Sequence, residues 1–294
     1  MRLVTFSDAK GARIGVHDIA SNEIVDLSAT TRLPRDMTAF VALGKKGLQR
    51  ARRAVKSGEG RLPFAAVRLL APFPRPAKNI LCVGKNYHEH AREFHSSGFD
   101  ASAKEAIPDV PIMFTKWPNS VIGSGEPIPS ANDYTNSTDY EGELTVVIGE
   151  GGRNISKDKA FDHVYGYTII NDATARTLQQ RHRQWFLGKS LDGYCPMGPC
   201  IVTADEIKNV GEMHLVTRVN GEVRQDAMVS DLIFDIPTLI ADLSRVMTLE
   251  PGDLIATGTC AGVGIGFNPP KYLQPGDVVA ITIEPIGTLE NPVS

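Results

Sequence analysis

The sequence has few cysteines, and their spacing excludes a metal framework built on thiolates. Four occur among 294 residues, at positions 82, 195, 200 and 260. Cys195 and Cys200 enclose Pro196 and Pro199, and this segment fits neither a CxxC pair nor a zinc ribbon. The four residues are therefore expected to be buried or semi-buried thiols in a reducing cytosol.

Long apolar runs and excess positive charge are also missing. No apolar stretch approaches the length of a bilayer-spanning helix, and residues 1–8 lack the apolar core and cleavage site of a signal peptide. The formal net charge is −3, and no Lys/Arg cluster is interleaved with aromatics. The densest basic run, residues 44–53, is typical of a solvated helix face. We therefore expect a cytoplasmic protein without a nucleic-acid or membrane partner.

Residues 1–72 predict a small accessory domain. Strand candidates at 2–7, 12–17 and 23–27 are separated by turns, and a helical stretch follows at 36–57. The segment 70–76 contains repeated prolines, which disfavour helix and central strand alike, and is typical of a linker. Residues 78–294 are expected to form the main domain.

The main domain is predicted to be rich in strands. Candidates recur at 79–83, 111–115, 144–148, 164–171, 215–219, 253–257 and 278–283. Asn220-Gly221 indicates a tight hairpin, and residues 233–247 have helical spacing with Pro237 near the first turn. The polar segment 95–108 is expected to be a long loop that could act as a lid. The absence of regular βαβ alternation favours a β-rich α+β fold over Rossmann or TIM architectures.

Two glutamates stand at the mouth of the apolar strand 144–148. Because residues i and i+2 of a strand point to the same face, Glu141 and Glu143 are expected to project side by side. Two buried like charges require a cation between them or a proton on one of them. Asp172 follows another apolar strand and, taken alone, resembles a helix N-cap. Together the three carboxylates predict an oxygen site of the kind that Mg²⁺ or Mn²⁺ prefers.

Other polar residues could supply a base and a positive charge. His90 and Glu93 are three residues apart on a predicted helical turn, so their side chains can touch. A carboxylate beside an imidazole raises its basicity and suits a general base, although a surface ion pair would have the same spacing. Lys189, between Gly188 and Ser190, could hold an oxyanion. The loop 256–266 could bind an anion through backbone N–H groups, or could be only a set of tight turns.

These segments, in this order, resemble the fumarylacetoacetate hydrolase family over roughly residues 78–293. The matching stretches are Gly84-Lys85-Asn86-Tyr87 with His90 and Glu93, Asp139-Tyr140-Glu141-Gly142-Glu143, Asn171-Asp172-Ala173-Thr174-Ala175-Arg176 with Gln179, Gly188-Lys189-Ser190-Leu191-Asp192, Cys195-Pro196-Met197-Gly198-Pro199, and Thr257-Gly258-Thr259 with Gly262-Val263-Gly264. The resemblance implies a catalytic domain that is a mixed β-sandwich roll, with a small N-terminal α/β accessory domain. It also implies a homodimer.

The resemblance assigns roles to particular residues. It implies that Glu141, Glu143 and Asp172 bind Mg²⁺ or Mn²⁺, that His90 and Glu93 form a dyad that activates water, and that Lys189 binds the developing oxyanion or enolate. Arg176, Gln179 and Thr259 would contact the substrate, and Lys116 is a further candidate for this role. One departure is Val83, which stands where the founding enzyme has a fourth aspartate ligand, and a second is Gly142 between the two glutamates.

The residues are consistent with more than one reaction. The first expectation is hydrolysis of a C–C bond in a small β-diketo acid, acylpyruvate-like or sugar-derived, to give pyruvate and an acid. The alternative is oxaloacetate decarboxylation or tautomerisation at the same site, because both reactions need an enolate stabilised next to a carboxylate. A metabolite-binding protein without turnover is a more distant third.

Overall fold

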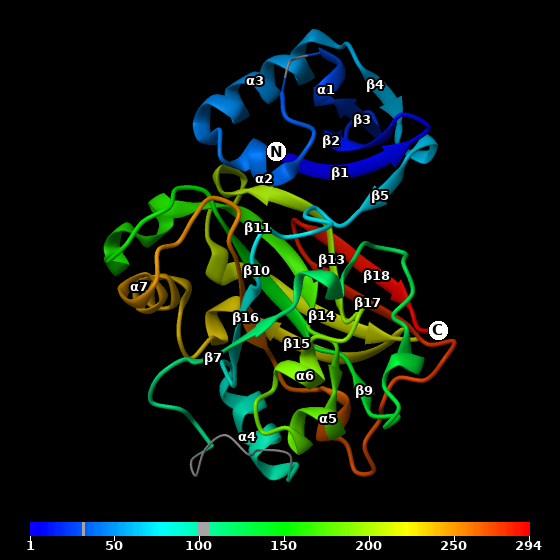
Figure 1. Cartoon of the computed structure of the whole chain (residues 1–294), viewed down its shortest axis with the longest axis vertical. Coiled ribbons are helices and arrows are strands. Elements are labelled where there is room, and N and C mark those ends of the chain that lie inside the picture. Colours follow the sequence, from blue (N-terminus) through cyan, green and yellow to red (C-terminus); the bar gives the residue numbers. More distant parts are fainter. Residues whose placement is uncertain (31–32, 99–105) are drawn as a thin grey trace.

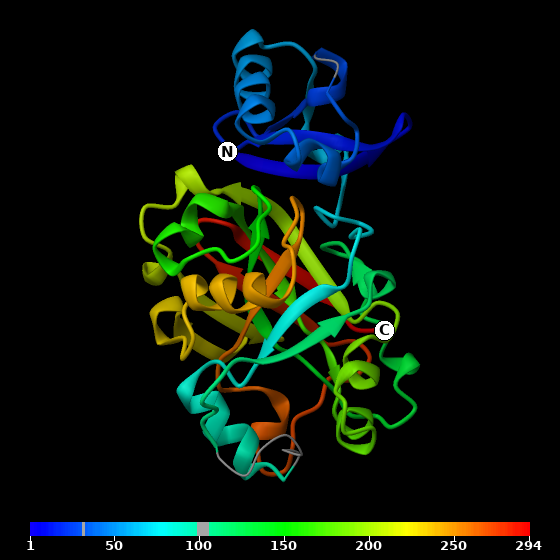
Figure 2. The ribbon, with the colours of Figure 1, turned by 60° about the vertical axis from the view of Figure 1, so that its left-hand side comes forward.

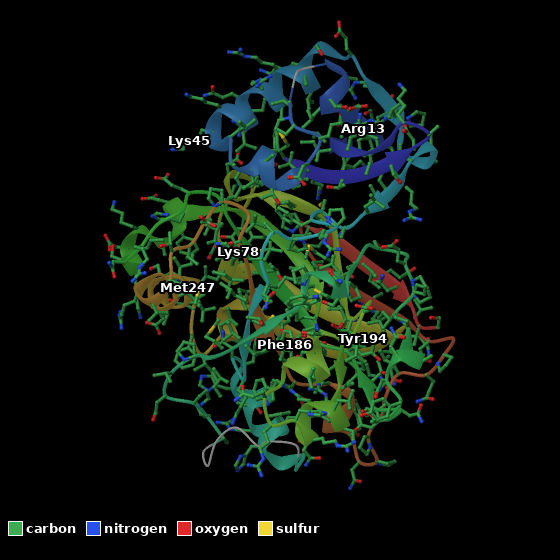
Figure 3. All side chains as sticks on the ribbon, in the orientation of Figure 1. Arg13, Lys45, Lys78, Phe186, Tyr194 and Met247 are labelled. Carbon is green, nitrogen blue, oxygen red and sulfur yellow. The ribbon has the colours of Figure 1, made fainter. Side chains whose placement is uncertain are left out.

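The N-terminal residues form a small body at one end of the molecule (Figure 1). The structure, a computed structural model, describes residues 1–30, 33–98 and 106–294. The small body contains β1 (Arg2–Asp8), β2 (Gly11–Asp18), β3 (Glu23–Asp26), β4 (Arg61–Pro63), β5 (Arg68–Leu70), α1 (Leu27–Thr30), α2 (Met37–Val41) and α3 (Gly44–Ser57). Arg13 is buried inside this body, whereas Lys45 lies on the outer face of α3 (Figure 3).

One sheet runs through both parts of the described chain. Its order is β4-β3-β2-β1-β13-β11-β10-β16-β6-β7, with β5 beside β1 and β8 beside β13. The later strands are β6 (Ile80–Gly84), β7 (Ile112–Lys116), β8 (Val121–Ile122), β10 (Gly142–Ile148), β11 (Val164–Asn171), β13 (Cys195–Thr203) and β16 (Leu254–Thr259). Leu3 of β1 is paired with Ile201 of β13, which joins the small body to the rest. The division into domains 1–72 and 78–294 stays a prediction.

A second sheet completes the predicted sandwich. It has the order β15-β14-β17-β18, formed by β14 (His214–Val219), β15 (Glu222–Met228), β17 (Val278–Ile283) and β18 (Gly287–Pro292). Leu144 and Val146 of β10 share an apolar core with Leu215 of β14 and Ile281 of β17, so the two sheets pack face to face. The β-rich mixed fold expected from the sequence is confirmed.

Short elements gather at the end of the large sheet that lies away from the N-terminal body. They are α4 (His88–Ser96), α5 (Arg176–Arg181), α6 (Phe186–Lys189), β9 (Thr138–Asp139) and β12 (Thr174–Ala175). Figures 1 and 2 agree in placing α4, α5 and α6 at this end, whereas α7 (Ile236–Val246) lies along one side. No helix in the described part of the chain has the length and apolarity needed to cross a membrane.

Several elements predicted from local patterns are present. The Asn220-Gly221 turn links β14 to β15, with φ of 52° and 82° at these residues, as a type I′ hairpin requires. The helical stretch 36–57 is divided into α2 and α3 around Ala42. Of the predicted loop 95–108, the first residues belong to the end of α4, and residues 99–105 lie outside the described residues.

The expected strands do not include β13, although it lies in the middle of the sheet. Two prolines, Pro196 and Pro199, obscure it in the sequence because proline cannot donate a ladder hydrogen bond. The register between β11 and β13 shifts where Tyr167 faces Val202 but Ile169 faces Gly198. Pro199 falls inside this irregularity, so its missing N–H disrupts no regular pair.

Candidate active site and metal centre

Three carboxylates meet at one edge of the large sheet. β10 and β11 run antiparallel with Gly142 opposite Asn171, so the start of β10 and the end of β11 lie together. Glu141, Glu143 and Asp172 occupy these positions, are all buried, and each offers an oxygen within 4.8 Å of the others. The structure thus brings the three predicted metal ligands together. Asp172 is not a helix cap, because α5 begins four residues later.

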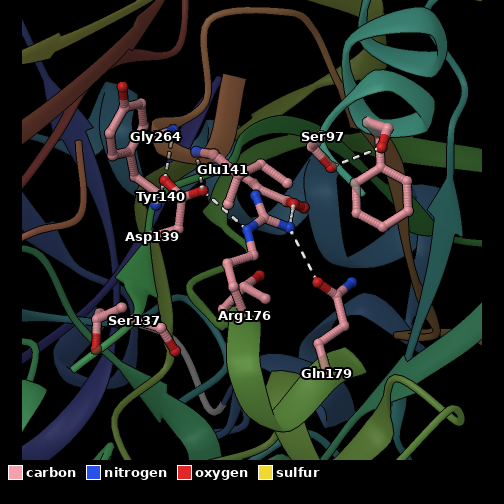
Figure 4. Close-up of polar contacts among 12 residues, drawn as sticks. Ser97, Ser137, Asp139, Tyr140, Glu141, Arg176, Gln179 and Gly264 are labelled. Carbon is pink, nitrogen blue, oxygen red and sulfur yellow. Dashed lines mark hydrogen bonds and ion pairs between the residues drawn. The ribbon is translucent and has the colours of Figure 1, made fainter. Parts of the chain in front are cut away.

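Three buried cations surround the carboxylates. Lys189 Nζ lies 2.6 Å from Glu141 Oε2 and 2.8 Å from Asp172 Oδ2. Lys116 Nζ lies 2.6 Å from Asp172 Oδ1, on the other side of that carboxylate. Arg176 Nη1 lies 2.6 Å from Glu141 Oε1 (Figure 4). Glu141 and Asp172 are therefore each held by two cations.

Glu143 is compensated differently from its neighbours. Within the described residues, no Lys, Arg or His makes an ion pair with it, and it accepts the N–H of Gly258 at 2.9 Å. Burial, with the charges of Asp172 and Glu141, raises the pKa of Glu143 well above its usual value. Burial also acts to raise the pKa of Glu141. The charges of Lys189 and Arg176 outweigh this effect and lower the pKa of Glu141 to about 2.

The donor set fits a divalent cation. Three buried carboxylates within reach of one another match the oxygen ligands of Mg²⁺ and Mn²⁺. A cation at this position would favour ionised Glu143, the carboxylate that the surrounding side chains leave least compensated.

The predicted dyad forms on α4 beside this centre. His90 Nδ1 lies 3.0 Å from Glu93 Oε2, and the other oxygen of Glu93 accepts the N–H of Gly262 at 2.9 Å. Because an ionised carboxylate can only accept, the bond places the imidazole proton on Nδ1 and leaves the lone pair on Nε2. His90 is buried and lines the same pocket as Glu141 and Glu143, so the pair is not a surface ion pair.

The pocket between these groups has one polar and one aromatic wall. Its polar lining consists of Lys85, His90, Glu141, Glu143, Arg176, Gln179, Lys189 and Thr259. The aromatic wall is built by Trp185, whose ring centroid lies 5.7 Å from that of Phe94 and 5.3 Å from that of Phe114. Gly84 permits this arrangement, because a Cβ there would lie 2.2 Å from the indole of Trp185.

The four predicted substrate contacts differ in their surroundings. Arg176 and Gln179 line the pocket, and Nη2 of Arg176 is buried without a hydrogen-bond partner in the described chain. Thr259 also lines it, but its hydroxyl already donates to the carbonyl of Gly142 at 3.0 Å. Lys116 is fully buried behind Asp172 and lies outside the pocket lining, so the structure gives it a role in holding that carboxylate. Contact of these residues with substrate stays a prediction.

Two residues of the site lie in recognised motifs but had no assigned role. Lys85 lines the pocket with a left-handed backbone, φ 54°, immediately after β6. Asp139 is fully buried and accepts hydrogen bonds from Arg176 and from the loop at Gly264 (Figure 4). The alternation of residues 139, 141 and 143 could have indicated that Asp139 belongs to the same site.

The two sheets carry a buried triad of carboxylates next to a His–Glu pair, and this combination defines a family of enzymes. Residues 79–294 match the model of the fumarylacetoacetate (FAA) hydrolase C-terminal region. The chain belongs to the fumarylacetoacetate hydrolase family, as the motifs indicated.

Related proteins cover nearly the whole chain. An oxaloacetate tautomerase, YisK of Bacillus subtilis, is 49% identical over 269 residues, which are 89% of this chain and 87% of the relative. The structure of a fumarylacetoacetate hydrolase from Exiguobacterium antarcticum superposes with a TM-score of 0.84 at 42% identity, covering 100% of this chain and 99% of that one. A maleylpyruvate hydrolase from Sphingobium sp. SYK-6, solved with manganese(II) and pyruvate, has a TM-score of 0.80 at 31% identity, covering 100% and 98%.

Proposed function

We propose that this protein is a divalent-metal-dependent enzyme that interconverts the keto and enol forms of oxaloacetate. The observation that carries the proposal is the convergence of three buried carboxylates with His90 and Lys189, and all of these except Asp172 line one pocket. The 49% identity to an oxaloacetate tautomerase supports our choice of this reaction over the C–C hydrolysis that the motifs first favoured. Mg²⁺ or Mn²⁺, held by Glu141, Glu143 and Asp172, would supply a Lewis acid that stabilises negative charge on a substrate oxygen.

His90 would transfer the proton. Its Nε2 carries the lone pair, because Nδ1–H is bonded to Glu93. In the keto-to-enol direction Nε2 removes a proton from carbon 3 of oxaloacetate, and the resulting imidazolium gives this proton to the oxygen on carbon 2. The reverse direction returns a proton to carbon 3. Glu93 stabilises the imidazolium that forms between these two transfers.

Two cations would hold the charged parts of the substrate. Lys189 donates two of its three N–H bonds to Glu141 and Asp172, which leaves one for an oxygen that develops negative charge. Arg176 has a buried Nη2 that can donate to a substrate carboxylate. Both side chains are fixed by ion pairs, so they need little reorganisation during the reaction.

Hydrolysis of an acylpyruvate is the second candidate, and the dyad is the observation that favours it. The same Nε2 of His90 could remove a proton from water that attacks the carbonyl at carbon 4, with release of pyruvate and an acid. The manganese and pyruvate in the maleylpyruvate hydrolase relative are consistent with this product.

Parallel assays of oxaloacetate and acetylpyruvate test the proposal. Loss of the ultraviolet absorbance of enol-oxaloacetate is followed with Mg²⁺, with Mn²⁺ and with a chelator, and pyruvate release is followed for acetylpyruvate. We expect metal-dependent enol conversion that His90→Ala slows by about 10²- to 10⁴-fold. His214→Ala is the matched control, because His214 also bonds to a carboxylate, Asp226 at 2.5 Å, but lies exposed on the second sheet.

The outcomes separate the alternatives. Cleavage of acetylpyruvate without conversion of oxaloacetate would establish the second candidate instead. Turnover that is equally fast in wild type and His90→Ala would remove the base from the mechanism. If neither oxaloacetate nor acetylpyruvate is turned over in the presence of metal, the metabolite-binding alternative is favoured.

A further inference from the structure

The carboxylate of Asp139 is saturated by four donors from different parts of the chain. Its Oδ2 accepts Nε of Arg176 at 2.8 Å and the N–H of Ile265 at 3.1 Å. Its Oδ1 accepts the N–H of Gly264 at 2.6 Å and that of Tyr140 at 2.8 Å. The side chain is fully buried. With every acceptor position directed at protein, Asp139 is equipped to hold groups in place and not to react.

The first group that Asp139 holds is the pocket arginine. The bond to Nε fixes the plane of the Arg176 guanidinium, whose Nη1 meets Glu141 at 2.6 Å and Gln179 Oε1 at 3.2 Å (Figure 4). In this plane Nη2 is buried without a partner in the described residues. Leaving a guanidinium N–H unpaired is costly unless a ligand accepts it, so the orientation enforced by Asp139 indicates an anion-binding donor.

The second group is the loop that supports the dyad. Asp139 holds the loop at Gly264 and Ile265, and the hydroxyl of the next residue, Tyr140, donates to the carbonyl of Gly262 at 2.8 Å. The N–H of Gly262 in turn donates to Glu93. Gly264 lies so close that a Cβ there would be 2.5 Å from Oδ1 of Asp139. The loop position, and with it the carboxylate behind His90, therefore depends on the Asp139–Tyr140 pair.

We propose that Asp139 is a positioning residue that couples the anion-binding arginine to the His90–Glu93 dyad. The proposal rests on the proposed function for the identity of the reaction but not for the coupling itself. One carboxylate fixes both the donor that binds the substrate and the loop that orients the base, so a single change at Asp139 should disturb binding and proton transfer together.

The test replaces Asp139 with asparagine, which has nearly the same shape but only one acceptor atom. In either orientation of the amide Arg176 loses its anionic partner, and the NH₂ group faces N–H donors at Arg176 and Ile265 or at Gly264 and Tyr140. Binding of oxalate in the presence of Mg²⁺ is measured by titration calorimetry, which requires no turnover. We expect Asp139→Asn to weaken oxalate binding about tenfold or more. Unchanged oxalate affinity would overturn the proposal.

A double-mutant cycle shows whether Asp139 acts through the arginine. Arg176→Lys keeps a cation for Glu141 but removes Nε and the fixed fork. We expect the oxalate affinity of the double variant to equal that of the weaker single variant, whereas multiplication of the two factors would show that Asp139 acts elsewhere. The matched control is Asp26→Asn, a buried carboxylate that accepts Nε of Arg13 at 2.5 Å outside the pocket, and it should leave oxalate binding unchanged.

A milder variant, Tyr140→Phe, tests the support of the loop if Asp139→Asn does not fold. Tyr140→Phe removes only the hydroxyl bonded to Gly262. We expect a lower kcat with unchanged KM and unchanged oxalate affinity, because Arg176 keeps its partner. An unchanged kcat would overturn the coupling to the dyad. If wild type turns over neither substrate, the proposed function fails, while the calorimetric cycle still decides whether Asp139 positions Arg176.

Discussion

Glu141 and Glu143 lie two residues apart, yet the protein compensates their charges in opposite ways. Lys189 and Arg176 pair with Glu141, whereas the N–H of Gly258 is the neutral donor that faces Glu143. We expect Glu143→Gln to raise the melting temperature of the metal-free protein at neutral pH, because burial and two carboxylates disfavour the ionised form of Glu143 that the unfolded chain carries at this pH. The same variant should weaken Mn²⁺ binding by at least about tenfold. Differential scanning fluorimetry and calorimetric titration measure the two effects.

Glu141→Gln is the matched comparison, with the opposite effect on stability. It leaves Lys189 and Arg176 without a carboxylate that both contact in a buried site. Removing one partner of a buried pair costs roughly 3–5 kcal/mol, so we expect a lower melting temperature in the metal-free protein. Equal stability changes in the two variants would contradict the unequal compensation described above.

The pairing of Glu141 with Glu143 and of His90 with Glu93 could be predicted from the sequence because each pair is local. Strand alternation places Glu141 beside Glu143, and helical spacing places His90 beside Glu93. The partners of Lys116 could not be predicted in this way. That lysine reaches Asp172, 56 positions further along the chain, and such contacts depend on how the strands are ordered in the sheet.

At the scale of elements, α4 and the loop 262–266 must approach closely to hold the dyad. A Cβ on Gly266 would lie 2.0 Å from Oε1 of Glu93, so Gly266→Ala must displace that carboxylate. We expect kcat to fall about tenfold or more, because His90 loses an oriented partner, while Mn²⁺ affinity stays unchanged. Steady-state kinetics and calorimetry check the two readouts.

Gly211→Ala is the control for this prediction. Gly211 also lies in a short 3₁₀ turn, but the nearest atom to its added Cβ would be 3.4 Å away. Activity should therefore be retained in Gly211→Ala. A Gly266→Ala variant as active as the control would show that Glu93 can be displaced without consequence.

The prediction of elements from the sequence succeeded where one local pattern dominates. The strand at 164–171 and the Asn220-Gly221 hairpin have clear signals and are present. β13 was obscured because Pro199 is accommodated by a register shift that only the neighbouring strand supplies. Close approaches such as that of Gly266 to Glu93 likewise depend on tertiary packing, although the glycine itself is visible in the sequence.

At the scale of the whole molecule, one apolar core links the N-terminal body to the catalytic sheet. Leu3 and Ile14 from the N-terminal strands belong to the same buried cluster as Ile80, Ile170 and Ile201. The sequence pattern predicted two domains from their separate textures, but it could not reveal that β1 and β13 share a sheet. A shared core and a shared sheet favour cooperative unfolding.

Leu3→Ala tests this cooperativity with an internal probe. Both tryptophans of the chain, Trp117 and Trp185, lie outside residues 1–72, so their fluorescence reports on the catalytic part. Leu3 is fully buried, and truncation to alanine should cost about 2–5 kcal/mol. We expect this loss to lower the denaturant midpoint of the fluorescence transition and of the circular-dichroism transition equally. Leu43→Ala is the control, because Leu43 lies in the same body but is 36% exposed. This change should lower the free energy of unfolding by no more than about 1 kcal/mol. A circular-dichroism transition in two steps, with an unchanged fluorescence midpoint, would instead show that the N-terminal body unfolds on its own.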